Sequence, residues 1–412
     1  MCSEPLLISP ENWPFNLEWL PQSAYLVGGA VRDALLHRRS EYLDLDFVLP
    51  TDAVKTAQVI ARHYKAGFVL LDEQRQIARV VFKQATVDFA QQEGSSLETD
   101  LRRRDFTINA IAYNPHTKEL IDPLQGYVHL QQNLLKMVSQ QNLQDDPLRL
   151  LRAYRQAAQL NFKIDPDTQA IIRQLAPMLS QVAAERVRVE LSYLLGSKET
   201  AWLIAAWKDN LLATWFKNAT PKQLQKLAAI DSAAVTLAQT WSNLGIQLTQ
   251  VVRALKITWL GIAKLTCLVS PNPEIAETEL MQLTYSRAEI KSVTTALKVL
   301  PQLQSNVEMP LAEQYFFFRT AGAVFPSVGV LALADGISVD AIAPLINCYL
   351  NPDNAIAHPI PLVTGKDLMQ ALGLPSSPLI GKLLTQIQLA HIEGKISTPA
   401  AALQLAAELV SE

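Results

Sequence analysis

Residues 26–48, LVGGAVRDALLHRRSEYLDLDFV, contain the pattern that decides the fold. An apolar pair leads into Gly28 and Gly29, and Arg32 follows one helical turn later. Glycine lets backbone N–H groups come close to an anion, so this turn and the following arginine are suited to hold a phosphate. Alone, a glycine pair is also typical of a plain strand-to-helix turn. Whether this turn binds a phosphate therefore depends on the residues that follow it.

Two aspartates, Asp44 and Asp46, follow twelve residues after the arginine and alternate with apolar residues. This alternation predicts a strand with both carboxylates on one face and Leu45 toward the core. Like charges side by side repel unless a cation lies between them, and Mg²⁺ prefers carboxylate oxygens. We therefore predict that Asp44 and Asp46 bind Mg²⁺, with Asp88 of the β-rich run ATVDFA as a third catalytic carboxylate. The alternative for the pair alone is two exposed carboxylates on an edge strand.

Composition limits the partners and the compartment. The net charge is −3, so a nucleic acid would have to bind a local basic surface such as Arg102–Arg104. The cysteines Cys2, Cys267 and Cys348 lie far apart, which predicts a reducing compartment without disulfides. We see no signal peptide and no apolar run of membrane-spanning length, so we expect a cytoplasmic protein that does not bind a membrane.

Periodicity changes along the chain. Residues 24–125 contain β-rich runs and a helical segment, TAQVIARHY, whereas the chain from about residue 140 contains long Leu-, Ala- and Gln-rich stretches at helical spacing. We predict an α+β fold in which a small mixed sheet with helices precedes an all-helical neck, body and tail. The predicted boundaries are 1–140 for the head, 141–200 for the neck, 201–352 for the body and 353–412 for the tail.

Several longer motifs occur in one order along the first half of the chain. They are GGAVRD at 28–33, LDLD at 43–46, RRDFTINA at 103–110, LIDPLQG at 120–126, DDPLRLLRAYR at 145–155 and ERVRVEL at 185–191. In order and spacing they resemble the class II tRNA nucleotidyltransferase and bacterial poly(A) polymerase family. The resemblance implies a polymerase-β-like nucleotidyltransferase head and extends from residue 26 to about 195. Residues 363–384 also resemble the C-terminal unit of many members.

The resemblance also implies roles for individual residues. Asp44 and Asp46 would hold the catalytic Mg²⁺ ions. The triphosphate would contact the glycine turn and Arg32, and the sugar would lie near Asp105 and Asn109. The complete expected nucleotide site is Gly28, Gly29, Arg32, Arg104, Asp105, Asn109, Asp146, Arg149, Arg152 and Arg155.

In the segment DDPLRLLRAYR, Arg149, Arg152 and Arg155 recur every three residues after Asp146 and form a slowly winding ridge on a helix. The resemblance implies that Asp146 and Arg149 recognise the edge of the incoming base, with the later arginines in support. A carboxylate acceptor and a planar donor fork suit the edges of C and A. Locally, Asp146 and Pro147 are also typical of a helix N-terminus, and both roles are compatible.

The resemblance implies template-independent addition of C and A, as CCA or as CC alone, to tRNA 3′ ends from CTP and ATP by two-metal transfer. Members carry a flexible loop of about two dozen residues before the arginine motif, whereas this chain has only residues 89–96 there. Addition of both C and A is the first interpretation, and the short segment opens two alternatives to a loop-driven switch: the enzyme adds CC alone and another protein adds A, or another element performs the switch to A. Poly(A) polymerase activity is a further alternative, although the typical G-[RK]-[RK]-F stretch is missing. A catalytically dead RNA-binding relative is a third alternative, and the intact Asp44 and Asp46 argue against it. The helical body and tail would bind the acceptor and T stems. The sequence does not indicate an oligomeric state.

Overall fold

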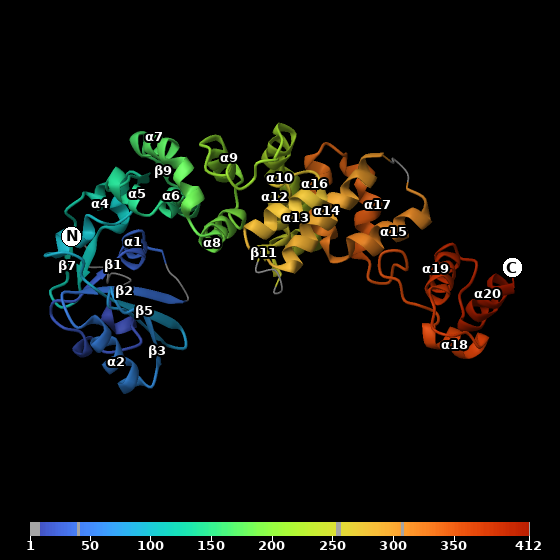
Figure 1. The fold of residues 1–412 in the computed structure, drawn as a ribbon, viewed down its shortest axis with the longest axis horizontal. Helices are drawn as coiled ribbons and strands as arrows, with labels where there is room; N and C mark the ends of the chain where they lie inside the picture. The colour runs from blue at the N-terminus through green and yellow to red at the C-terminus, as the bar shows by residue number, and fades with distance from the viewer. Residues whose placement is uncertain (1–8, 39–41, 253–256, 306–308, 412) are drawn as a thin grey trace. The chain divides into compact units, whose positions relative to one another are not determined.

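The computed structural model describes residues 9–38, 42–252, 257–305 and 309–411 (Figure 1). Cys2 lies outside these ranges. The chain divides into two compact units, Met1–Glu190 with Ala205–Thr214 and Leu191–Ile204 with Trp215–Glu412. The first unit holds the predicted head and most of the predicted neck. The four-part division with its boundaries stays a prediction.

In its described residues, the first unit contains a seven-stranded mixed sheet with the order β3-β4-β5-β2-β1-β6-β7. Only β2 and β5 pair in parallel, and the other neighbours are antiparallel. The predicted β-rich runs are thereby confirmed as strands. The strands are β1 (Tyr25–Val27), β2 (Leu43–Leu49), β3 (Gly67–Asp72), β4 (Ile77–Val81), β5 (Ala85–Gln91), β6 (Ala112–Asn114) and β7 (Glu119–Ile121).

Alternation along the strands separates an apolar face of the sheet from a polar one. Phe47 and Phe89 stack on each other on the apolar face, where Trp13 and Phe15 pack against them. Helix α2 (Ala53–Tyr64) packs on β3, β4 and β5 on this side. The aspartates of β2 lie on the opposite face, as the alternation predicts.

Short helices surround the polar face and continue into the neck. Several begin with a capping side chain: Ser96, Ser139 and Asp165 each accept a hydrogen bond from a backbone N–H group at a helix start. The remaining helical segments of the N-terminal half are η1 (Pro10–Asn12), η2 (Leu17–Trp19), α1 (Gly29–Leu35), α3 (Leu97–Leu101), η3 (Thr107–Asn109), α4 (Gly126–Gln131), α5 (Gln140–Asp145), α6 (Leu148–Leu160), α7 (Pro166–Leu175), η4 (Ala176–Gln181), α8 (Ala184–Leu195) and α9 (Ala201–Lys208).

The second unit is helical, as predicted. One core lies among the body helices, and the tail has its own core around Leu368 and Leu383. Its helical segments are α10 (Pro221–Thr240), α11 (Ser242–Thr249), α12 (Trp259–Thr266), α13 (Pro273–Gln282), α14 (Arg287–Ser305), α15 (Leu311–Ala321), η5 (Gly322–Val324), α16 (Phe325–Ala334), α17 (Val339–Leu350), α18 (Gly365–Leu372), α19 (Pro378–Ile392) and α20 (Pro399–Ser411).

Two short pairs of strands lie outside the seven-stranded sheet. Strand β8 (Leu134–Leu135) pairs with β9 (Lys163–Ile164), and strand β10 (Val251–Val252) pairs with β11 (Ile257–Thr258).

The stretch Leu311–Ala334 is long and apolar enough to cross a membrane, but 67% of its most apolar window is buried inside the unit. Such burial is typical of a core helix, so this stretch is weak support for a membrane span.

Candidate active site

Strand register places two of the three predicted carboxylates, Asp46 and Asp88, in one row on the polar face. The parallel pairing of β2 and β5 sets Asp46 opposite Asp88, and the antiparallel pairing of β4 sets Arg79 opposite Asp88. Two residues further along the same three strands, Val48, Ala90 and Ile77 form an apolar row. A charged row therefore borders an apolar row on one continuous surface.

Asp44 and Asp46 form a site with an excess of negative charge. Burial and the neighbouring carboxylates Asp44 and Asp88 raise the pKa of Asp46 to about 6, although Arg104 and Arg79 oppose this rise. The Asp44 Oδ1 atom accepts a hydrogen bond of 2.7 Å from the Thr86 hydroxyl group. A divalent cation would relieve the repulsion that raises the Asp46 pKa, so these two residues fit the predicted metal.

The third predicted carboxylate has a partner that the sequence analysis missed. Arg79 Nε and Nη2 donate to the two oxygens of Asp88 at 2.7 and 2.8 Å, in a bidentate pair. Within the described ranges, no three His, Cys, Asp or Glu side chains are arranged to hold a metal together. The period of two along ARVV was the available signal, because it places Arg79 on the same face as Asp88 if the strands pair in this register.

Gly28 brings the glycine turn directly against this site. Its φ of +73° is a conformation that other residues rarely adopt, and it precedes the first residue of α1. A Cβ atom at Gly28 would lie 3.3 Å from Asp46 Oδ2 and 3.4 Å from Arg104 Nη1. The structure thus brings together the predicted glycine turn, one predicted metal ligand and the predicted nucleotide-binding Arg104.

Four other predicted nucleotide-site residues bind one another in a partly buried network. Arg32 Nη1 donates to Asn109 Oδ1 at 2.8 Å, and Asn109 Nδ2 donates to Asp105 Oδ1 at 2.9 Å. Arg152 Nη2 lies 3.0 Å from Asp105 Oδ2. Gln156, which the sequence analysis did not select, receives a second hydrogen bond from Asn109 at 3.0 Å. The network connects α1, η3 and α6.

Asp105 is the buried centre of that network. Burial raises its pKa, but Arg152, Asn109 and the Phe106 N–H group more than compensate, so the pKa of Asp105 lies below its ordinary value. Its carboxylate oxygens accept from the Phe106 N–H group at 2.8 Å and from Asn109. The expected contact of Asp105 and Asn109 with the sugar stays a prediction, and in this structure both residues are buried.

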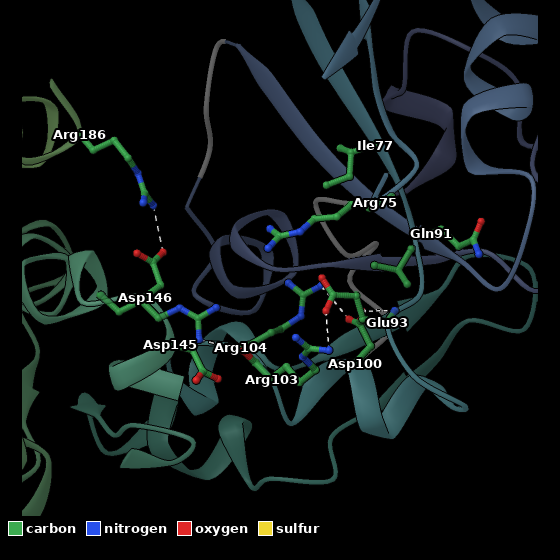
Figure 2. Close-up of a pocket in the computed structure, with 13 residues that line it drawn as sticks. Arg75, Ile77, Gln91, Glu93, Asp100, Arg103, Arg104, Asp145, Asp146 and Arg186 are labelled. Atoms are coloured by element: carbon green, nitrogen blue, oxygen red, sulfur yellow. Dashed lines mark hydrogen bonds and ion pairs between the residues drawn. The ribbon is translucent and has the colours of Figure 1, made fainter. Parts of the chain in front are cut away.

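A cavity of about 540 Å³ lies over the apolar row. Figure 2 shows charged side chains surrounding it, with Asp145 and Asp146 from the end of α5 and Arg186 from α8. Asp146 Oδ2 accepts from Arg186 at 3.0 Å. The walls and floor are formed by Val48, Arg75, Ile77, Ala90, Gln91, Glu93, Asp100, Arg103, Arg104, Asp145, Asp146, Arg149 and Arg186.

The three arginines of the predicted ridge lie in three different environments. Arg149 lines the cavity and donates to the backbone carbonyls of Arg103 and Asn142 at 2.9 and 3.0 Å. Arg152 belongs to the buried network, and Arg155 Nε lies 2.6 Å from the Glu190 carboxylate. Only the first of the three arginines therefore borders the cavity together with Asp146.

The start of the arginine helix differs from a simple capped N-terminus. Pro147 is the residue before α6, and no side chain caps this helix with a hydrogen bond. The Asp146 carboxylate lies 3.4 Å from the Leu148 N–H group, which is a long contact, while it is paired with Arg186. Local capping therefore accounts for little of what Asp146 does.

The short segment before the arginine motif is fixed at several points. The Gln92 N–H group donates to the Leu49 carbonyl at 2.7 Å, and the Glu93 N–H group donates to Asp100 at 3.0 Å. The Glu93 carboxylate lies 2.7 Å from Arg103, and Ser96 begins α3. A short, multiply bonded connection of this kind has little freedom to change the wall of the cavity.

Comparison with known proteins identifies the family. A family model described as Poly A polymerase head domain matches residues 24–136, and models described as a probable RNA and SrmB-binding site of polymerase A and as tRNA nucleotidyltransferase domain 2 match 161–223 and 255–407. A CC-adding tRNA nucleotidyltransferase of Synechocystis sp. is 52% identical over 400 residues, covering 96% of each chain. The chain belongs to the tRNA nucleotidyltransferase family. The resemblance inferred from the sequence motifs is confirmed.

Other members of the tRNA nucleotidyltransferase family support the same assignment over nearly the whole chain. A CC-adding tRNA nucleotidyltransferase of Geobacter sulfurreducens is 30% identical over 390 residues, covering 92% of this chain and 90% of the relative. The solved structure of a CCA-adding enzyme with CTP superposes with a TM-score of 0.75 over 94% of this chain and 91% of that one. At 22% identity, this likeness shows the fold, and it confirms the predicted head followed by helical parts.

Proposed function

We propose that this nucleotidyltransferase adds the two cytidines of the CCA end to tRNA from CTP and leaves the terminal adenosine to another enzyme. The observation that carries the proposal is the short segment 89–96, in which Gln92 and Glu93 are bonded to Leu49, Asp100 and Arg103. The relatives in Synechocystis and Geobacter, both named CC-adding, support the same product.

Since tRNA processing takes place in the cytoplasm of bacteria, we propose that this protein is located there.

A change from C to A requires a change in the pocket. Cytosine and adenine both present an amino donor beside a ring-nitrogen acceptor, but the larger purine places this edge farther from the sugar, so one rigid pair of groups cannot reach both bases in the same way. Around this cavity, Arg103 is tied to Glu93, and Arg104 lies 3.3 Å from Asp100. These contacts hold the wall in one arrangement, which supports recognition of a single base.

The proposed reaction is attack of the tRNA 3′-oxygen on the α-phosphorus of CTP, with a new P–O bond formed and pyrophosphate released. Asp44 and Asp46 would hold Mg²⁺, which when bound would neutralise charge on the attacking and leaving oxygens in a two-metal arrangement. Arg104 and the turn at Gly28 would contact the triphosphate, because they border Asp46 directly. Arg32, which donates to Asn109 at 2.8 Å, would hold Asn109 in place beside the nucleotide.

Asp88 has a different proposed role from the one expected for a third metal ligand. Its two oxygens are both engaged by Arg79, and it lies next to Asp46 in the strand register. We propose that Asp44 and Asp46 bind the metal. The Asp88–Arg79 pair would keep the charged row in position and set the electrostatic potential beside Asp46.

Base recognition is proposed for Asp146 and Arg149, which border the cavity together. Replacing Asp146 by alanine removes an ionised acceptor that we expect to contact the cytosine amino group. Loss of a hydrogen bond to a charged group costs about 1.5–3 kcal/mol, so kcat/KM for CTP should fall about 10- to 100-fold. The measurement is single-nucleotide addition with CTP, ATP and UTP, and the ratio of CTP to UTP should fall with it. An unchanged ratio would exclude Asp146 from base recognition.

The product can be determined with three tRNA transcripts that end at the discriminator base, at C and at CC. Each is incubated with CTP, with ATP and with both nucleotides, and the products are separated at single-nucleotide resolution. We expect two additions to the first transcript, one to the second and none to the third. Addition of the terminal A would contradict the proposal and show that a short segment permits the full CCA reaction. Long A tails would instead support the poly(A) alternative.

A further inference from the structure

The cavity contains an arginine that neither the motifs nor the proposed mechanism uses. Arg75 lies in the turn between β3 and β4, and it lines the cavity that also contains Asp146 and Arg149. In Figure 2 its side chain points from this hairpin into the cavity. It belongs to none of the motifs of the arginine helix or of the glycine turn.

The turn fixes the position from which Arg75 extends. The Arg75 N–H group donates to Asp72 Oδ1 at 2.9 Å, which forms an Asx-type turn. Gln76 has a φ of +51°, and its carbonyl accepts from the Gln91 N–H group at 3.2 Å. The hairpin is thus attached to β5, and the Arg75 backbone has a defined place at the edge of the cavity.

Arg75 differs from the other arginines of the cavity in having no partner for its guanidinium group among the described residues. Arg103, Arg104 and Arg186 each pair with a carboxylate. Arg149 donates to two backbone carbonyls. An unpaired guanidinium group at the wall of a substrate cavity is available for the substrate.

Strand geometry places Arg75 on the base side of the cavity. The charged row contains Arg79 of β4, and the apolar row contains Ile77, about 7 Å further along the strand. Arg75 follows beyond Ile77, in the direction away from Asp46 and toward the cavity. It therefore lies on the far side of the apolar row from the proposed metal and triphosphate site.

We propose that Arg75 is a nucleotide-binding residue that lies against the base and sugar of the incoming CTP. The inference rests on the proposed function. A guanidinium plane stacks on a base and attracts its π system, and the apolar row of Val48, Ala90 and Ile77 would support the opposite side of the nucleotide. Arg75 thereby closes the pocket from the hairpin, across from Asp146 and Arg149.

The test compares two ligands that share a triphosphate but differ in the base. CTP and inorganic tripolyphosphate are titrated calorimetrically into the full chain with Mg²⁺ and without tRNA. The variants are Arg75→Ala and Arg75→Lys, with Arg62→Ala as the matched control, since Arg62 is exposed on α2 on the other face of the sheet. Because the Arg75 guanidinium group has no partner within the described part of the chain, we expect each variant to fold normally.

We expect Arg75→Ala to weaken CTP binding about tenfold and to leave tripolyphosphate binding within about twofold of wild type. Arg75→Lys should recover only part of the loss, because an ammonium group cannot stack, and Arg62→Ala should bind both ligands normally. In turnover, the KM for CTP should rise while kcat stays close to wild type.

Three results would overturn the inference: unchanged CTP affinity, an equal loss of CTP and tripolyphosphate affinity, or a rise confined to the KM for tRNA. The second would place Arg75 at the phosphates, and the third at the RNA primer. Failure of the proposed function is a separate observation, because it would show as wild-type protein that adds no CMP to tRNA or that also adds the terminal A. A wild-type protein that adds CMP, with an Arg75→Ala variant that binds CTP equally well, contradicts the inference alone.

Discussion

Replacing Asp46 or Asp44 by asparagine should reduce CMP transfer to tRNA at least about 1,000-fold, which corresponds to about 4 kcal/mol of transition-state stabilisation. Asparagine keeps the shape of each side chain and removes its charge. Burial and the nearby Asp44 and Asp88 raise the pKa of Asp46 more than Arg104 and Arg79 lower it, so a bound cation would further stabilise the ionised carboxylates. Without either carboxylate, the site loses the charge that would bind the metal.

The fold should survive these substitutions, since removing one of two repelling charges relieves the folded state. Circular dichroism and thermal unfolding check the fold, electron paramagnetic resonance of Mn²⁺ checks metal binding, and labelled CTP checks transfer. Asp88→Asn is the informative comparison, because Arg79 already neutralises Asp88. We expect it to retain Mn²⁺ binding and to lose less activity, about 10- to 100-fold. Normal transfer by a folded Asp46→Asn protein would refute the assignment.

The strand that carries these aspartates was predictable because its signal is local. A period of two over residues 43–47 determines which side chains share a face, whatever the rest of the chain does. The pairing of Asp88 with Arg79 was not predictable in the same way. It depends on the register between β4 and β5, and a shift by one residue would have turned Arg79 to the other face.

The nucleotide-site residues show a second limit of sequence analysis. The motifs identified Arg32, Asn109, Asp105 and Arg152 but assigned them to different parts of the substrate. The structure joins them in one network, because α1, η3 and α6 pack at the same place. Such contacts between distant segments depend on tertiary packing, which propensity and spacing do not encode. The short segment 89–96 was visible as a length, but its hydrogen bonds were not.

The network around Asp105 makes a strong prediction about stability. Asp105→Ala should lower the free energy of unfolding of the first unit by about 3 kcal/mol, because it leaves the Asn109 amide, the Phe106 N–H group and Arg152 without their shared acceptor. In thermal unfolding this is a decrease in Tm of roughly 6–12 °C. A matched control is Glu98→Gln, which breaks an exposed ion pair with Arg102 and should cost less than about 1 kcal/mol.

The pH dependence separates the charge of Asp105 from its packing. Because the pKa of Asp105 is lowered on folding, its contribution is complete above the unfolded value of about 4 and is lost as the pH falls through the lower folded value. The difference in stability between wild type and Asp105→Ala should therefore be constant from pH 7 to about 5 and shrink below pH 4. Urea unfolding at a series of pH values measures it. A difference that stays the same down to pH 3 would show that the carboxylate charge does not stabilise the network, and that only the hydrogen-bonding shape of the side chain does.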